Sequence, residues 1–223
     1  LADLAGGTMV AGFVHGVLNS DNMNITGESF DYGPWRFLPR WDGAFTAAYF
    51  DHSGLYAFGR QPGAIGWNLS QLALALSPLA PREALVAALE RFGPLYEAAL
   101  ARRWCWRLGV AQAGGEADSA LVAASETVMR EQDIGPDAFF HRHRGGRAAS
   151  GALAEALAGR TALAPDHALW DEPAPPALLI EEVEALWAPI AADDDWAPLH
   201  DAIAAIRRLG DALGPAPEPL GHG

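Results

Sequence analysis

The sequence contains no lysine: all 15 of its basic residues are arginine, against 28 Asp and Glu, so its formal net charge is −13. A chain this acidic does not bind nucleic acid or an anionic membrane through its overall charge, and we expect neither as a partner. Many phosphate-transfer sites depend on one lysine, and these 223 residues cannot supply it.

Cysteine is also scarce, since Cys105 is the one cysteine in the sequence and excludes an intrachain disulfide. Its place between two tryptophans predicts a buried helix residue rather than a reactive thiol. Residues 4–20 and 61–81 lack charge, but both contain Gly and Asn, which favours buried helices and loops over membrane spans. No basic segment followed by an apolar one opens the chain, so we expect a cytoplasmic protein.

Half of the residues are hydrophobic, enough for one sizeable core or two modest ones. Apolar periodicity predicts a mainly α fold, with one small β-hairpin. Helices are expected at 1–14, 64–76, 81–110 with a break at Gly93-Pro94, 117–132, 148–158, 178–188 and 196–213. Residues 32–61, rich in Gly, Pro and aromatics, are expected to form a long irregular segment.

Residues 15–33, HGVLNSDNMNITGESFDYG, crowd Asp21, Asn22 and Asp31 around a short β-prone run. Gly27 can supply the positive φ of a hairpin turn, so strand, turn and strand are predicted for residues 23–31. Crowded carboxylates repel one another and lose hydration unless a positive group lies among them. The cluster therefore points to a site for a metal and phosphate, although turn chemistry alone also favours Asp and Asn.

The spacing of these residues matches the protein-kinase pattern of H-R-D-x-x-x-x-N followed, after a hairpin, by D-F-G. His15 and Asn22 take the places of the His and Asn, and Asp31-Tyr32-Gly33 takes the place of D-F-G. Such sites hold a divalent metal on oxygen ligands next to the phosphates. His15 and Gly33 are expected to support the loop structurally rather than to react.

One position departs from the kinase pattern in a way that affects the chemistry. The usual catalytic Asp is replaced by Val17, which cannot accept a proton, and the nearest carboxylate is Asp21. A conventional kinase with this loop would lack its base.

Three motifs together resemble the selenoprotein O family of kinase-like proteins. They are H-G-V-x-N-[ST]-D-N-M from His15, D-Y-G-P from Asp31, and Q-P-x-x-x-x-W-N-L-x-x-L-A from Gln61, in the family's order. The resemblance is strong over residues 9–80 and extends more weakly to about residue 146.

The resemblance implies a protein adenylyltransferase, which transfers AMP from ATP to Ser, Thr or Tyr hydroxyls of other proteins. It implies Asp21 as the proton acceptor, Asn22 as a ligand of Mg²⁺ or Mn²⁺, and Asp31 as a ligand of both the metal and the ATP phosphates. The implied fold is the C-terminal lobe of a protein-kinase-like fold plus a helical extension. The N-terminal lobe, with its glycine-rich loop and lysine, is expected to be absent from these residues.

The chain is accordingly expected to be part of a longer protein, since it begins at Leu1 inside a helical pattern. We expect a kinase-like core at 1–110, the extension at 111–213 and a disordered tail at 214–223. Two alternatives stay open: a phosphotransferase that acts on the γ-phosphate of ATP, and a non-catalytic lobe that binds a partner.

Two further predictions concern the remaining aromatic and basic residues. The segment FFHRHRGGR at 139–147 is expected to be a solvated basic face, with an anion contact as the minority view. Trp67, Trp104, Trp106 and Trp187 are expected to lie in the core.

Overall fold

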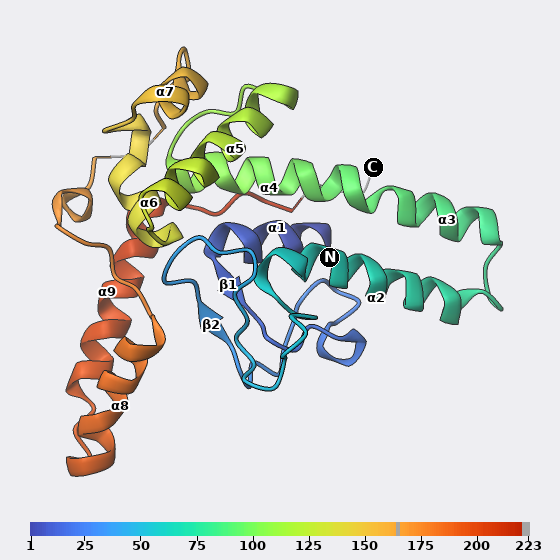
Figure 1. The fold of residues 1–223 in the computed structure, drawn as a ribbon, viewed down its shortest axis with the longest axis horizontal. Helices are drawn as coiled ribbons and strands as arrows, with labels where there is room; N and C mark the ends of the chain where they lie inside the picture. Colours follow the sequence, from blue (N-terminus) through green and yellow to red (C-terminus); the bar gives the residue numbers. More distant parts are fainter. Residues whose placement is uncertain (164–165, 220–223) are drawn as a thin grey trace. The chain divides into compact units, whose positions relative to one another are not determined.

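A computed structural model describes residues 1–163 and 166–219, and it is mainly helical, as predicted (Figure 1). The helices are α1 Ala2–Ala11, α2 Gln61–Leu76, α3 Arg82–Glu90, α4 Phe92–Leu108, α5 Gly115–Glu131, α6 Pro136–His143, α7 Gly151–Leu157, α8 Ile180–Asp193 and α9 Ala197–Leu213. The strands β1 Phe13–Val14 and β2 Arg36–Phe37 pair in one two-stranded sheet.

The chain forms two compact units. Unit 1 consists of Leu1–Arg36 and Asp42–Arg103 together with Glu218 and Pro219, and unit 2 consists of Phe37–Trp41 and Trp104–Pro217. The boundaries expected after residues 110 and 213 stay predictions, and residues 220–223 of the expected tail lie outside the described residues.

The predicted helices are present, with shifted ends. The break expected at Gly93-Pro94 falls at Arg91, one residue before α4 begins. Pro94 then lies in the first turn of α4, where its missing N–H has no helical acceptor to lose. Helix α6 was not predicted, because only eight residues form it and its apolar pattern is too short to show a period.

The hairpin predicted at residues 23–31 is reduced to a single antiparallel bridge between Met23 and Ser29. Its turn is as expected, since Gly27 has φ +97° and its N–H donates to the carbonyl of Asn24 over 3.1 Å. The two-residue strands β1 and β2 were missed, because a pair this short has no alternation to read.

The core of unit 1 brings α1, α2 and the first part of α4 together. Ala5, Leu18 and Ile65 are buried at its centre. Gly6 lies against α4 so closely that a Cβ there would come within 2.9 Å of the Leu100 nitrogen. The carboxylate of Asp3 binds both Arg102 and Arg103 at this contact, which ties the two helices by charge as well as by packing.

Aromatic rings fill the core of unit 2. Trp104 is fully buried, with ring centroids 5.7 Å from Trp41 and 5.2 Å from Phe140. Cys105 beside it is buried, as predicted, and burial raises the pKa of its thiol to about 12. The prediction of a core position was wrong for Trp67 in α2 and Trp187 in α8, which are 59% and 60% exposed.

The basic segment at residues 139–147 was expected to be solvated. That prediction holds for Arg142 and Arg147, which are exposed, and is wrong for its other basic side chains. His141, His143 and Arg144 are all buried. The Arg144 guanidinium donates to the carbonyls of Trp106 and Arg107, at the end of α4, over 2.6 and 2.8 Å. The carbonyls at a helix C-terminus carry partial negative charge, which stabilises a cation there. Within the described residues, Arg144 takes part in no ion pair with a carboxylate.

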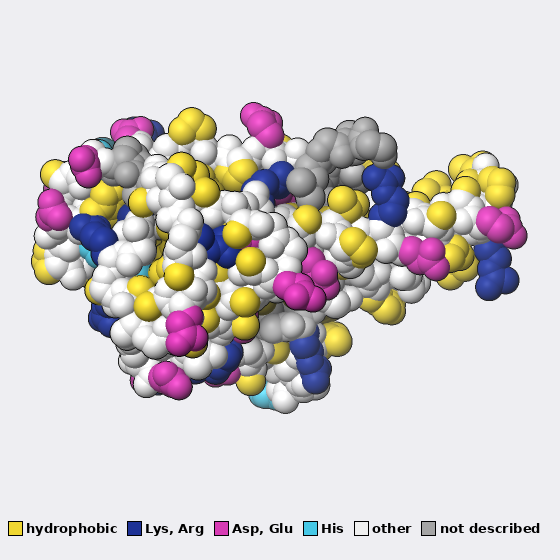
Figure 2. Space-filling model, turned by 90° about the horizontal axis from the view of Figure 1, so that it is seen from above, with side chains coloured by type: hydrophobic (Ala, Val, Ile, Leu, Met, Phe, Trp, Pro, Cys, Tyr) yellow, Lys and Arg dark blue, Asp and Glu magenta, His cyan; other side chains and the backbone are white. Residues whose placement is uncertain are grey.

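The hairpin of α2 and α3 leaves apolar side chains in solvent. Leu74, Leu79 and Val86 are exposed, and Figure 2 shows hydrophobic side chains at the end of this hairpin, on the right. Among the described residues, no helix is both long and apolar enough to cross a membrane.

Candidate metal and nucleotide site

The predicted site residues lie on the loop between β1 and β2 in unit 1. A 3₁₀ turn, Ser20–Asn22, carries the first two, and the N–H of Asn22 donates to the carbonyl of Asn19 over 3.2 Å. The turn directs neighbouring residues oppositely: Asp21 is exposed, whereas Asn22 is 7% exposed.

The side chain of Asn22 is held in one orientation. Its Nδ2 donates to the carbonyl of Val17 over 2.8 Å. A carbonyl can only accept, so the amide nitrogen must face Val17 and the amide oxygen must face the other way. Asn22 thus offers an oriented oxygen donor, the kind of ligand that Mg²⁺ and Mn²⁺ prefer.

The backbone brings Asp31 next to Asn22. The N–H of Phe30, one residue before Asp31, donates to the carbonyl of Asn22 over 3.1 Å. On the other side, the hydroxyl of Tyr32 donates to the carbonyl of Ser29. Asp31 therefore lies between two anchored neighbours, in the left-handed region at φ +58°, with its carboxylate exposed.

The ring of His15 hydrogen-bonds to two parts of the loop, and its supporting role stays a prediction. Its Nε2 is 2.8 Å from the Phe30 carbonyl, which can only accept, so the hydrogen lies on Nε2. The Nδ1 atom is left as the acceptor for the N–H of Val17, 3.4 Å away. One fully buried ring thus joins the loop before the 3₁₀ turn to the residue before Asp31.

Gly16 and Gly33, two of the three glycines of this loop, differ in their surroundings. Gly16 has φ +83°, and a Cβ there would come within 2.8 Å of Pro34 Cγ, so the backbone requires glycine. At Gly33 a Cβ would meet nothing within 4 Å. The structural support expected from Gly33 stays a prediction. The packing requires glycine at position 16, to which sequence reasoning gave no role.

Two buried amides of α2 also belong to this region, and sequence reasoning gave them no role. Gln61 accepts from the N–H of His15 over 2.9 Å and donates to the carbonyl of Phe13 over 2.8 Å. Asn68 donates to the carbonyl of Leu18 over 3.0 Å. The signal was present in the sequence: these amides are seven residues apart, which places them on one face of a helix with no charge between them.

The carboxylates of the loop are available to a ligand. Asp21 and Asp31 take part in no ion pair within the described residues. Across residues 1–163 and 166–219, no group of three or more His, Cys, Asp and Glu side chains is placed to hold a metal ion. The carboxylate of Asp31 and the amide oxygen of Asn22 make a smaller set, which suits an ion that keeps several waters, as Mg²⁺ does.

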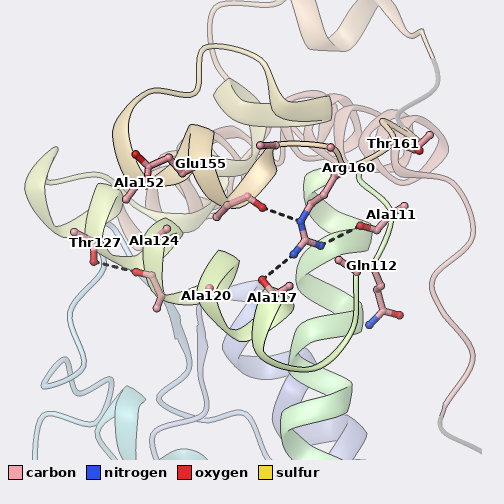
Figure 3. A pocket seen from close by; sticks show the side chains of 15 residues that line it. Ala111, Gln112, Ala117, Ala120, Ala124, Thr127, Ala152, Glu155, Arg160 and Thr161 are labelled. Carbon is pink, nitrogen blue, oxygen red and sulfur yellow. Dashed lines mark hydrogen bonds between the residues drawn. The ribbon is translucent and has the colours of Figure 1, made fainter.

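A separate cavity lies in unit 2 between α5 and α7. It encloses about 920 Å³ and is lined mainly by alanines, with Gln112, Thr127, Glu155 and Arg160 among them (Figure 3). The guanidinium of Arg160 donates to the carbonyls of Ala111, Ala117 and Ala156 and to the buried carboxylate of Asp118. These partners leave the guanidinium of Arg160 little capacity to bind a further anion.

Comparison with known proteins decides the family. The sequence model of the family described as "Protein adenylyltransferase SelO" matches residues 1–152, which include the whole loop. The chain belongs to the SelO family. Its SelO relatives include the "Protein nucleotidyltransferase YdiU" of Gloeobacter violaceus, 35% identical over 237 residues, covering 93% of this chain and 48% of the relative.

Shorter matches to other SelO proteins have higher identity. The protein of the same description from Hahella chejuensis is 49% identical over 115 residues, or 52% of this chain and 23% of the relative. That from Synechocystis is 47% identical over 116 residues, covering 52% of this chain and 24% of the relative. The chain spans about half the length of the curated relatives that it matches over most of its own length.

Proposed function

We propose that unit 1 carries the metal-binding and hydroxyl-activating residues of a protein adenylyltransferase, and that its fold is the C-terminal lobe of a kinase-like enzyme. The reaction transfers AMP from ATP to a Ser, Thr or Tyr hydroxyl of a protein, in the cytoplasm. The observation that carries the proposal is the hydrogen bond from the Phe30 N–H to the Asn22 carbonyl, which holds the residue before Asp31 beside Asn22. Asn22 contributes an oriented amide oxygen and Asp31 an exposed carboxylate.

The donor set of this loop fits Mg²⁺ or Mn²⁺, because Asn22 and Asp31 contribute hard oxygen ligands. When bound, such an ion neutralises phosphate oxygens and polarises the phosphorus that is attacked. In the proposal, Asn22 and Asp31 hold the ion, and Asp31 also orients the phosphates through it. The hydrogen bonds of Phe30 and Tyr32 fix the backbone on both sides of Asp31. A fixed backbone of this kind is part of the preorganisation that such chemistry requires.

Asp21 is the proposed proton acceptor. It is exposed on the 3₁₀ turn, one residue before the proposed ligand Asn22, so its carboxylate is open to an acceptor hydroxyl. Val17 cannot take that role, and its carbonyl is already occupied by Asn22. As the hydroxyl proton passes to Asp21, the hydroxyl oxygen bonds to the α-phosphorus, the bond from that phosphorus to the bridging oxygen breaks, and pyrophosphate leaves.

The choice of the α-phosphorus rests on the family and not on these residues. Asp21, Asn22 and Asp31 would serve attack on the γ-phosphorus equally well, since the orientation of the triphosphate decides which phosphorus is in line. Both the SelO description and the relatives' names specify nucleotidyl transfer. Since the chain spans half the length of those relatives, activity and substrates of the whole protein are part of the proposal.

The test supplies the protein as encoded with an acceptor protein, Mg²⁺ and ATP labelled at either the α- or the γ-phosphate. We expect label from the α position to enter protein, pyrophosphate to be released, and Asp21→Asn to stop both. Asp201→Asn, an exposed carboxylate of α9, is the matched control and should leave the rate unchanged. Protein labelled only from the γ position would show a phosphotransferase, and no label from either would show a binding module.

A further inference from the structure

The amides of Gln61 and Asn68 lie on one face of α2 and hold the backbone of the proposed active-site loop. Both side chains are buried, Gln61 completely and Asn68 to 5% exposure. Gln61 uses both ends of its amide, accepting from the N–H of His15 and donating to the carbonyl of Phe13. Asn68 reaches the same loop three residues further on, at the carbonyl of Leu18.

From this anchored loop, one short connection runs to each proposed metal ligand. The amide of Asn22 is oriented by the carbonyl of Val17, which lies between the residues held by Gln61 and Asn68. The ring of His15 binds the carbonyl of Phe30, one residue before Asp31. The direction of the Asn22 oxygen and the position of Asp31 thus both depend on the segment that α2 holds.

Asn68 is not explained by stability alone. Its Oδ1 is buried and has no hydrogen-bond partner in the described part of the chain. A buried acceptor without a donor costs stability, so an apolar residue of similar shape would remove that cost together with the bond to Leu18. The Nδ2 bond to the loop is therefore what the asparagine provides at this position.

We infer that Gln61 and Asn68 are positioning residues of the metal site, acting through the backbone of residues 13–18. The inference rests on the proposed function in that it takes Asn22 and Asp31 as the metal ligands. Groups that orient a ligand from behind typically affect metal affinity or activity by about 10- to 100-fold when they are removed.

The experiment compares Asn68→Leu and Gln61→Met with Gln71→Met, a matched change at a half-buried glutamine of the same helix. Two readouts are measured on the protein as encoded: the dissociation constant of Mn²⁺ in the presence of ATP, and hydrogen exchange of the loop amides without metal. Asn68→Leu keeps the core apolar and removes an unpaired acceptor, so it stays folded even where Gln61→Met, which unpairs two buried backbone groups, does not.

We expect Asn68→Leu to weaken Mn²⁺ binding about tenfold or more, with an unchanged melting temperature and faster exchange of the loop amides. Gln71→Met should change the dissociation constant less than twofold. Unchanged Mn²⁺ affinity in both Asn68→Leu and Gln61→Met would overturn the inference.

The outcomes separate this inference from the proposed function. Label entering protein only from the γ-phosphate would refute adenylyl transfer, whereas the Mn²⁺ comparison would still test the positioning role. A wild-type protein that binds no Mn²⁺ with ATP would refute both. A metal site that is weakened by Asp31→Asn and unaffected by Asn68→Leu would refute the positioning role alone.

Discussion

The carboxylates of unit 1's loop and the buried carboxylate of unit 2 are treated in opposite ways. Asp118 is 2% exposed and binds Arg160 over 2.6 Å, with the N–H groups of Ala113 and Gly114 donating to it as well. Burial acts to raise the pKa of this carboxyl, but these donors outweigh burial and hold it below its usual value. Asp21 and Asp31, by contrast, are exposed and take part in no ion pair in the described part of the chain.

The difference separates a carboxylate that stabilises the fold from one that is free to bind a ligand. In unit 2 the carboxylate of Asp118 is paired with Arg160, so it has little capacity to bind a ligand. In the loop of unit 1 the backbone is fixed, by Gln61, His15 and Tyr32, while the charges stay open. A rigid backbone with unpaired carboxylates is the arrangement expected of a binding site.

The strongest test removes the charge of Asp31 without changing its backbone. Asp31→Asn suits the left-handed conformation at φ +58°, which Asn tolerates and Ala does not. We expect metal-dependent transfer to fall about 1000-fold, or ~4 kcal/mol, with an unchanged free energy of unfolding. Steady-state kinetics and urea denaturation measure the two. Metal-dependent ATP binding that persists in this variant would remove Asp31 from the site.

The matching test in unit 2 should change stability. Arg160→Met leaves Asp118 buried without its cation, which should reduce the free energy of unfolding by about 3 kcal/mol. Arg130→Met, on the exposed face of α5, breaks a solvated ion pair and should cost under about 1 kcal/mol. Urea denaturation followed by tryptophan fluorescence compares them. Equal losses in the two variants would mean that the buried pair contributes no more than a surface one.

Two glycines of the loop make a smaller comparison. Gly16→Ala places a Cβ 2.8 Å from Pro34 Cγ at φ +83° and should cost about 2 kcal/mol of stability. Gly33→Ala meets nothing within 4 Å and should change stability by about 0.5 kcal/mol or less. Thermal unfolding of both variants checks the difference. A large loss at Gly33 would show that its backbone, rather than its space, requires glycine.

The smallest effect is expected from pH, through His143 in unit 2. Burial lowers the pKa of His143, with Arg142 adding to the shift and the hydrogen bond to the Arg147 carbonyl opposing it. A proton therefore prefers the unfolded chain, so this contribution to stability is complete above the unfolded pKa of about 6.5 and declines as the pH falls below it. His143→Gln should flatten the dependence of the melting temperature between pH 7 and 5. An unchanged slope in that variant would assign the dependence to other groups.

Local patterns predicted much of the helical structure and singled out the candidate site residues. Apolar periodicity gave the helices from α1 to α9 apart from α6, and Gly27 marked its turn correctly. Local pattern failed where burial depended on distant partners. The basic segment at residues 139–147 was expected in solvent, yet Arg144, which follows α6, is buried against the end of α4, 37 and 38 residues earlier in the chain.

The sequence by itself determined the family, the mainly helical class and the candidate residues Asp21, Asn22 and Asp31, because motif spacing and helical period are local properties of a chain. Only the tertiary structure showed that α2 holds the loop, since the hydrogen bonds of Gln61 and Asn68 join residues 46 to 50 positions apart. It also decided which carboxylates are paired and which stay open. That depends on the desolvation and the partner that each side chain meets after folding, and neither is encoded in residue type.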